Sequence, residues 1–272
     1  MSPSLPTDIL DLIADHLHDE PTKLRACCLV SKSWVPRTRR HLFAFLEFDA
    51  SPRSESTLEL WMKAFPDPSN SPARYTRGLH LARYLAITVA ISKARRWVHS
   101  FNHLTYLAVT TAGVDDHHIS FTQLHGLSPS LKSLRLSYSH APLPELLALI
   151  CSFPLLEDLV LGSVRDRENT PEWDAPPTSP KFIGSLCLGG KTRDITRKLL
   201  DLPGGLHFSS IAVSCPIEDG DLANELVSMC SDTLESFLLD FSYLGTLPTT
   251  PANDQYLITA RGYRWVWDTA FA

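Results

Sequence analysis

The chain has 272 residues, of which 44% are hydrophobic and 20% are charged, and its formal net charge is −5. This length and composition are typical of a globular protein with one or two domains and a substantial core. The modest negative charge gives no general electrostatic reason to expect a nucleic-acid-binding protein, which would need a basic surface.

The chain opens with the apolar spacing of an amphipathic helix. Leu5, Ile9, Ile13 and Leu17 recur at steps of four, and Pro6 stands in the opening turn, where helices tolerate proline. The pattern predicts a short helix with one apolar stripe.

A second helical run comes after a short break. Leu24, Cys28, Leu29 and Trp34 lie at similar intervals, and Pro36 is predicted to end or kink that helix. Together the two runs carry more apolar residues than so short a segment can bury alone. We therefore expect the segment to pack against a partner surface.

Residues 4–48 resemble the F-box, in the form found in fungal F-box proteins. The resemblance is carried by Leu5-Pro6 before an acidic residue and an Ile-Leu pair, by the helix around Leu24, and by LVSKSW at residues 29–34 with basic residues after it. It implies a three-helix module that docks on the Skp adaptor and, through it, on a cullin-based ubiquitin ligase. The vicinal Cys27-Cys28 replaces the larger aliphatic residues usual in the family, although small apolar thiols also suit a helix interface. The adaptor contacts that the resemblance implies are Leu5, Pro6, Ile9, Ile13, Leu24, Cys28, Val30 and Trp34.

An alternative for this segment needs no partner. The helices would then form a cap that buries its apolar stripe against the rest of the chain, because periodicity cannot name the surface that covers a stripe.

Residues 49–73 read as a linker around one short helix. Proline and serine at Ser51-Pro52 and in the run 66–72 favour turns. Between them, Leu58, Trp61 and Phe65 have helical spacing and are expected to pack the N-terminal helices onto the region after the linker.

After the linker one apolar pattern recurs at nearly constant spacing. An apolar residue is followed by a second three positions later and a third two positions after that, with final positions 25 to 27 residues apart. The copies are Leu104/Leu107/Val109, Leu131/Leu134/Leu136, Leu156/Leu159/Leu161, Ile183/Leu186/Leu188, Phe208/Ile211/Val213 and Leu234/Phe237/Leu239. Leu79/Leu81 extends the series backward, and Leu46/Phe48 is a candidate for an earlier irregular copy. This even spacing predicts an α/β solenoid of short parallel strands with one buried face.

Several copies offer a helix between strands, in residues 84–98, 142–151, 195–202 and 221–229, whereas the proline-rich residues 165–180 look irregular. A strand, a turn and a helix per repeat resemble the leucine-rich repeat, with LKSLRL and LEDLVL as the best copies. The side chain that usually bonds the backbone is missing, since Ala112, Ser139, Val164, Lys191, Pro216 and Ser242 replace Asn or Cys. A non-repetitive α/β domain with a parallel sheet is the alternative.

The candidate target-binding positions between the apolar ones are Thr105, Lys132, Arg135, Glu157, Asp158 and Glu235.

The end of the chain interrupts the repeat at Pro248 to Asn253. Tyr263, Trp265 and Trp267 then alternate as in a strand, which favours a segment that caps the last repeat. An exposed aromatic patch for a partner is the alternative.

Catalytic motifs are not evident. The residues from His99 to His125 include five histidines and two aspartates, but neither HExxH nor CxxC accompanies them, so a surface loop is favoured over a metal site of a hydrolase. We find neither a phosphate-binding loop nor a nucleophile elbow. Six scattered cysteines and no signal peptide favour reduced thiols in an intracellular protein, cytoplasmic or nuclear, that does not cross a membrane.

These observations predict a non-enzymatic substrate receptor without a cofactor. Residues 1–48 would be the adaptor-docking module, 49–73 a linker, 74–247 the leucine-rich-repeat-like solenoid that binds a target protein, and 248–272 a cap or tail. Two alternatives are open: a protein-binding scaffold whose N-terminal helices only cap the solenoid, and a metal-dependent hydrolase that uses the histidine-rich region.

Overall fold

The computed structural model describes residues 6–49, 57–82, 100–110, 121–125, 127–137, 143–162, 180–190, 192–240 and 255–258. The chain divides into two compact units, Met1–Ser133 and Leu134–Ala272.

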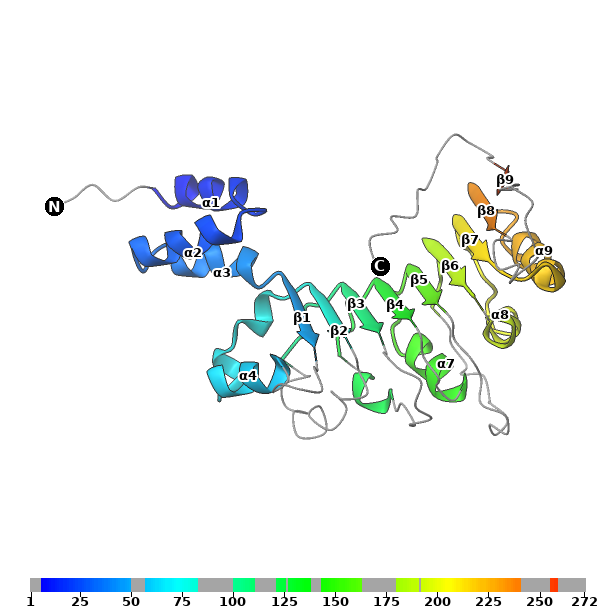
Figure 1. Cartoon of the computed structure of the whole chain (residues 1–272), viewed down its shortest axis with the longest axis horizontal. Helices are drawn as coiled ribbons and strands as arrows, with labels where there is room; N and C mark the ends of the chain where they lie inside the picture. The colour runs from blue at the N-terminus through cyan, green and yellow to red at the C-terminus, as the bar shows by residue number, and fades with distance from the viewer. Residues whose placement is uncertain are drawn as a thin grey trace, which may run out of the picture. The chain divides into compact units, whose positions relative to one another are not determined.

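Three short helices precede the first strand: α1 (Thr7–His16), α2 (Pro21–Val30) and α3 (Val35–Leu42) (Figure 1). We call them the helical module. Helix α2 ends at Val30 because Ser31 takes an extended backbone, with φ −160° and ψ 161°. Pro36 lies in the first turn of α3, where its missing N–H leaves no helical hydrogen bond unmade. The prediction of one helix that reaches Trp34 and ends or kinks at Pro36 is therefore wrong, since Pro36 helps to begin a third helix.

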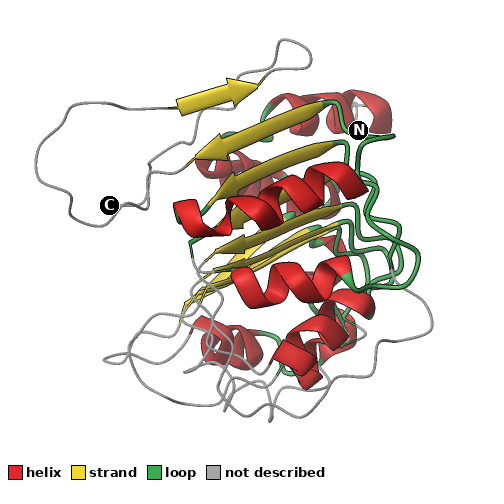
Figure 2. Ribbon diagram, turned by 90° about the vertical axis from the view of Figure 1, so that its right-hand side faces the viewer, coloured by secondary structure: helices red, strands yellow, loops and turns green. Residues whose placement is uncertain are grey.

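Short strands form the rest of the framework. They are β1 (Phe45–Asp49), β2 (Gly78–Ala82), β3 (Tyr106–Thr110), β4 (Ser133–Ser137), β5 (Asp158–Gly162), β6 (Ser185–Gly189), β7 (Ser210–Ser214), β8 (Ser236–Asp240) and β9 (Gln255–Ile258). Within the described ranges the strand order follows the chain, β1 to β8 are parallel, and β9 is antiparallel to β8. Figure 2 shows this reversal in the directions of the arrows. The predicted row of parallel strands is confirmed, and the irregular copy at Leu46/Phe48 is β1.

Helices alternate with these strands. They are α4 (Thr57–Ala64), α7 (Leu143–Cys151), α8 (Arg193–Leu200) and α9 (Gly220–Met229), with short 3₁₀ turns η1 (Pro68–Asn70), η2 (Pro72–Tyr75), η3 (Thr122–Leu124) and η4 (Ile217–Asp219). The helices expected near residues 58–65, 142–151, 195–202 and 221–229 are thus present. The one expected at 84–98 and the irregular segment at 165–179 lie outside the described residues. No helix in the described part of the chain is both long and apolar enough to cross a membrane.

Register aligns the apolar pair of each strand with that of its neighbour. In the first unit Leu79 pairs with Leu107 and Leu81 with Val109, and all four side chains are buried. In the second unit the same rows continue through Leu159, Leu186, Ile211 and Phe237, and through Leu161, Leu188, Val213 and Leu239. Since side chains two apart on a strand share a face, the repeat turns one face of each parallel strand toward the core. The apolar pair on that face is buried in β2 to β7 and half-buried in β8.

A second row, made of backbone groups, runs just before the strands. One carbonyl accepts hydrogen bonds from two successive N–H groups of the following repeat: Ala44 O from Arg77 N at 2.8 Å and Gly78 N at 2.9 Å. The same two-to-one pattern recurs at the carbonyls of Arg77, Thr105, Gly184 and Ser209. We call this row the carbonyl ladder. It bonds the backbone of one repeat to that of the next.

The α4 segment attaches the helical module to the strands through aromatic rings. The Trp61 ring lies 5.7 Å from Phe43, which comes directly after α3, and 5.7 Å from Phe48 on β1. Phe65 and Phe101 complete the cluster, with ring centroids 4.7 Å and 6.5 Å from Trp61. The predicted packing role of Trp61 and Phe65 is confirmed.

One apolar position of the repeat was assigned wrongly from the sequence. Phe182, not Ile183, is buried, and its ring packs 5.2 Å from that of Phe208. Phe182 stands four positions before the next buried residue, Leu186, instead of three. The extra residue is accommodated by a φ of 45° at Phe182, in the left-handed region. The larger aromatic area gained by burial explains why the phenylalanine is inside and Ile183 is exposed.

At the end of the sheet, β9 pairs with β8 in antiparallel register, with Phe237 opposite Ile258. The expected cap therefore begins as a strand at residues 255–258. Tyr263, Trp265 and Trp267 lie outside the described residues.

The neighbours Phe182 and Ile183 provide a matched pair of variants. Phe182→Ala is expected to lower the free energy of unfolding by about 3–5 kcal/mol, because it leaves a cavity beside Phe208. Ile183→Ala is expected to change it by less than about 0.5 kcal/mol. Urea unfolding of the full chain, followed by circular dichroism, measures both. Equal losses for the two variants would contradict the assignment of the buried position.

Candidate functional site

The helical module has a small core of its own. Leu10 and Ala14 of α1, Leu24 of α2 and Thr38 of α3 are buried. These four are the only buried residues of the three helices. The remaining apolar residues of these helices are half-buried or exposed.

Two side-chain contacts, an ion pair and a hydrogen bond to an imidazole, tie α1 to α3. Arg37 Nε lies 2.6 Å from Asp11 Oδ1, and His41 Nε2 lies 2.8 Å from Asp15 Oδ1. Asp11 and Asp15 are four residues apart, as are Arg37 and His41, so each pair lies along one helix face. This spacing positions α1 on α3 with the face that carries Leu10 and Ala14 turned inward.

A hydrogen-bonded hydroxyl joins α2 to α3. Thr38 Oγ1 donates to the carbonyl of Trp34 at 2.9 Å, and Cys28 Sγ lies 2.8 Å from the same oxygen of Thr38. Since the hydroxyl proton is directed at the carbonyl, the Cys28 thiol is the donor to Thr38. The half-buried Cys28 therefore contributes to the contact between the helices.

Four large aliphatic side chains of the module are exposed, and we call them the exposed apolar set: Ile9, Leu12, Leu29 and Val30. Leu29 is 87% exposed, Val30 71% and Leu12 64%. Ile9, Leu12 and Ile13 share one side of α1, since residues three and four apart are neighbours on a helix. Leu29 and Val30 form the end of α2. Exposed leucines are common singly, but four large apolar side chains on three short helices are unusual.

The predicted adaptor contacts fall into three groups. Pro6, Ile9 and Val30 are exposed, whereas Ile13, Cys28 and Trp34 are half-buried. Leu24 is only 1% exposed, so it packs inside the module and offers almost no surface to a partner. Leu5 lies outside the described residues.

Leu12 and Leu29 were not among the predicted contacts. Leu12 stands three residues after Ile9, which is a helical neighbour position, and Leu29 belongs to the run that carries the family resemblance. The helical spacing from Ile9 could therefore have predicted Leu12 as a contact. The position of Leu29 within the motif could have predicted Leu29.

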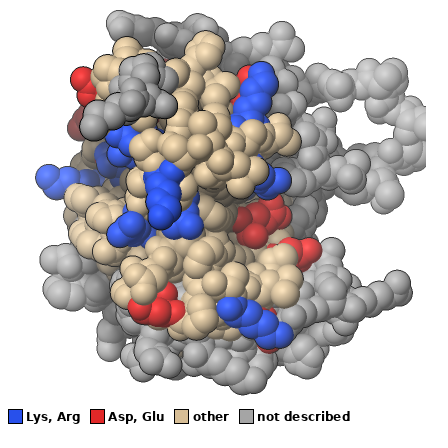
Figure 3. Space-filling model, turned by 90° about the vertical axis from the view of Figure 1, so that its left-hand side faces the viewer, with Lys and Arg blue, Asp and Glu red and all other residues tan. Residues whose placement is uncertain are grey.

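The helical module also carries exposed basic side chains. Figure 3, which looks onto the helical end of the chain, shows Lys and Arg side chains gathered near the centre of that face. The exposed basic residues of α2, α3 and the connection between them are Lys23, Arg25, Lys32, Arg39 and Arg40. The exposed charges of α1 and the turn after it are acidic instead, at Asp8, Asp15, Asp19 and Glu20. A partner that covers the exposed apolar set would therefore meet charges of both signs.

Four of the predicted target-binding residues lie directly before strands β3, β4, β5 and β8. Thr105, Lys132, Glu157 and Glu235 all contribute backbone groups to the hydrogen bonds between repeats. Thr105, Lys132 and Glu235 are exposed, and Glu157 is half-buried. Their backbones are thus fixed while their side chains are at or near the surface.

The other two predicted residues differ from each other. Arg135 is exposed in the middle of β4. Asp158 is half-buried, and its Oδ1 accepts hydrogen bonds from Ser185 N at 2.8 Å and Ser185 Oγ at 2.7 Å. A Cβ on Gly184 would lie only 2.6 Å from that oxygen, so glycine makes room for the contact. Asp158 therefore helps to hold β5 against β6.

The described cysteines and histidines differ in burial. Burial raises the pKa of the thiols of Cys151, Cys187 and Cys215 to about 11, so they are protonated at neutral pH and weakly nucleophilic. Among described residues, no group of three or more His, Cys, Asp or Glu is placed to hold a metal ion. His103 is exposed and His125 half-buried, whereas His99 and residues 115–118 lie outside the described part.

No family model matches the chain, and no curated protein matches it either.

Two leucines of α2, one buried and one exposed, provide matched variants that distinguish the core of the module from its surface. Leu24→Ala is expected to lower the local stability of α1 to α3 by about 2–5 kcal/mol, because it removes a buried side chain. Leu29→Ala carries the same change of helix propensity at an exposed site, so it is expected to leave that stability nearly unchanged. Hydrogen exchange of the backbone amides of the three helices measures both. Equal protection in the two variants would show that Leu24 is not part of the core.

Proposed function

We propose that this chain is the substrate-recognition subunit of a cullin-based ubiquitin ligase. The helical module docks on the Skp adaptor, and the strands with their connections form a leucine-rich-repeat-like solenoid that binds a target protein. The chain contributes proximity, because a bound target is held at high effective concentration beside the transferring enzyme.

The observation that carries the proposal is the exposed apolar set on so small a module. Helices of 10, 10 and 8 residues are too short to be stable alone and need tertiary packing. The aromatic cluster at Trp61 supplies that packing at one end. Even so, Leu12, Leu29 and Val30 face solvent, as expected of a module that meets a partner.

The alternative, in which the helices only cap the strands, accounts for less of what is seen. A cap would bury its apolar residues against its own chain, as Phe43 does against Trp61 and Phe65. The exposed apolar set has no such cover among the described residues. This difference favours docking over capping.

The strands supply the second half of the proposal. Their outward positions carry side chains of mixed character, from Glu47 and His80 in the first unit to Cys187 and Asp240 in the second. Outward positions in a parallel, in-register row stand at regular intervals beside one another. Such a row suits the recognition of an extended surface or segment of another protein.

Replacing Leu29 and Val30 together tests the docking surface. The double variant Leu29→Ser, Val30→Ser is expected to weaken adaptor binding at least about 30-fold, because two aliphatic side chains that would be buried in the interface are lost. Isothermal titration of the full chain with the purified adaptor measures the affinity.

The control is Leu60→Ser, which alters a leucine of α4 that is 50% exposed and lies outside the module. It is expected to keep wild-type affinity. Association that survives the double variant, or that is absent from the wild-type chain with a folded module, would rule out docking through this surface.

A further inference from the structure

One large aromatic ring lies on the outward face of the first unit. Leu46 and Phe48 of β1 point toward the core, so Phe45, Glu47 and Asp49 occupy the other face of the strand. Phe45 is 54% exposed. A ring of this size at the surface forgoes the free energy of burial that the core would give it, and such rings are frequent at binding sites.

The neighbouring strands hold this ring in place. Phe45 is paired with Gly78 on β2, and Gly78 with Tyr106 on β3. The Phe45 ring extends over Gly78, where a Cβ would come within 2.5 Å of its Cδ2 atom. Its centroid lies 6.1 Å from that of Tyr106, with the ring planes at 38°. Glycine at position 78 thus allows two aromatic rings to meet across three strands.

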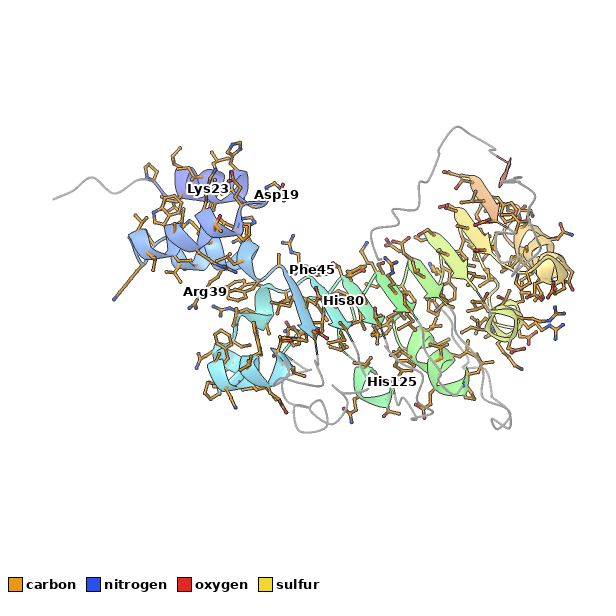
Figure 4. All side chains as sticks on the ribbon, in the orientation of Figure 1. Asp19, Lys23, Arg39, Phe45, His80 and His125 are labelled. Atoms are coloured by element: carbon orange, nitrogen blue, oxygen red, sulfur yellow. The ribbon has the colours of Figure 1, made fainter. Side chains whose placement is uncertain are left out.

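A carboxylate stands next to the ring on the same strand. Glu47 is two residues beyond Phe45 on the same face, roughly 7 Å along the strand. Glu47 Oε1 lies 3.5 Å from His80 Nδ1, and His80 Nε2 lies 3.1 Å from Thr110 Oγ1. The imidazole is therefore held between a carboxylate and a hydroxyl. Figure 4 shows Phe45 and His80 on the neighbouring strands β1 and β2.

The Glu47 side chain is nevertheless available to a partner. It is 56% exposed, whereas His80 is 20% exposed, so the carboxylate keeps an open side when the imidazole contacts it. An exposed aromatic face and an exposed carboxylate roughly one long side chain apart match a cationic residue. A planar charged head can stack over the ring and reach the carboxylate from there.

We propose that the surface formed by Phe45, Tyr106 and Glu47 binds an arginine side chain of the target protein. The planar guanidinium stacks on the Phe45 ring and donates its N–H groups to the Glu47 carboxylate, a pairing that suits arginine better than lysine. Calling the bound protein a target rests on the proposed function, whereas the site itself rests on the contacts among these strands.

The test is a titration of the full chain with an acetylated and amidated peptide, Gly-Ser-Arg-Ser-Gly, followed by nuclear magnetic resonance. The expected result is saturable shifts of the Phe45 and Tyr106 ring signals and of the Gly78 amide. The same peptide with citrulline in place of arginine keeps the shape but loses the charge. It is expected to bind at least about 5-fold more weakly.

Three variants locate the site. Phe45→Leu and Glu47→Gln are each expected to weaken binding of the arginine peptide about 2- to 5-fold, since each removes one exposed contact. Gly78→Val keeps both groups but pushes the Phe45 ring off β2, so a similar loss is expected. Glu225→Gln, at an exposed carboxylate of α9, is the matched control and is expected to bind like wild type.

The outcomes separate this site from adaptor docking, because the peptide titration needs no adaptor. Equal binding of the citrulline peptide, or shifts confined to other acidic residues, would overturn the arginine site even if the adaptor binds. Shifts at Phe45 and Gly78 in a chain that does not bind the adaptor would support the site and contradict the docking function.

Discussion

The carbonyl ladder is the constraint on which the strand framework depends. At Ala44, Arg77, Thr105, Gly184 and Ser209 one carbonyl receives two N–H groups from the next repeat. These bonds satisfy backbone groups that would otherwise be unpaired where the chain turns into each strand. They also fix where each strand starts relative to its neighbour, and a slip of one residue would turn every apolar side chain outward. The apolar rows and the outward faces are consequences of that fixed start.

Sequence spacing predicted the strands well because both of their signals are local. A strand of five residues with two apolar side chains two apart has few alternatives once the pattern recurs every 25 to 28 residues. The errors arose where the residue at the regular spacing is not the residue that packs into the core. Ile183 stands at the regular spacing, but Phe182 is buried, and only a backbone with positive φ makes that possible. In the same way, Pro36 reads equally well as the end of one helix or the beginning of another.

The candidate surface was harder to predict than the framework. Leu24 and Leu29 are the same residue type in one short helix, yet the first is buried and the second exposed. The contact of Cys28 with Thr38 on α3 decides which side of α2 turns inward. The position of α1 on α3 is fixed by an ion pair and a hydrogen bond between side chains 26 residues apart in the chain. A periodic pattern shows that a stripe exists, but not what covers it. The surface at Phe45 could not be predicted from the sequence for the same reason, because only the pairing of the strands brings Gly78 and Tyr106 beside the Phe45 ring.

The antiparallel pairing of β9 with β8 has a consequence for solubility. A row of parallel strands ends in an edge whose N–H and C=O groups can accept another strand, including one from a second molecule. A parallel addition would extend the array in the same register and so would invite end-to-end growth into fibres. The antiparallel strand β9 pairs with β8 and covers this edge, so a second molecule cannot add a parallel strand to β8. The reversal at β9 therefore ends the parallel register of the sheet at β8.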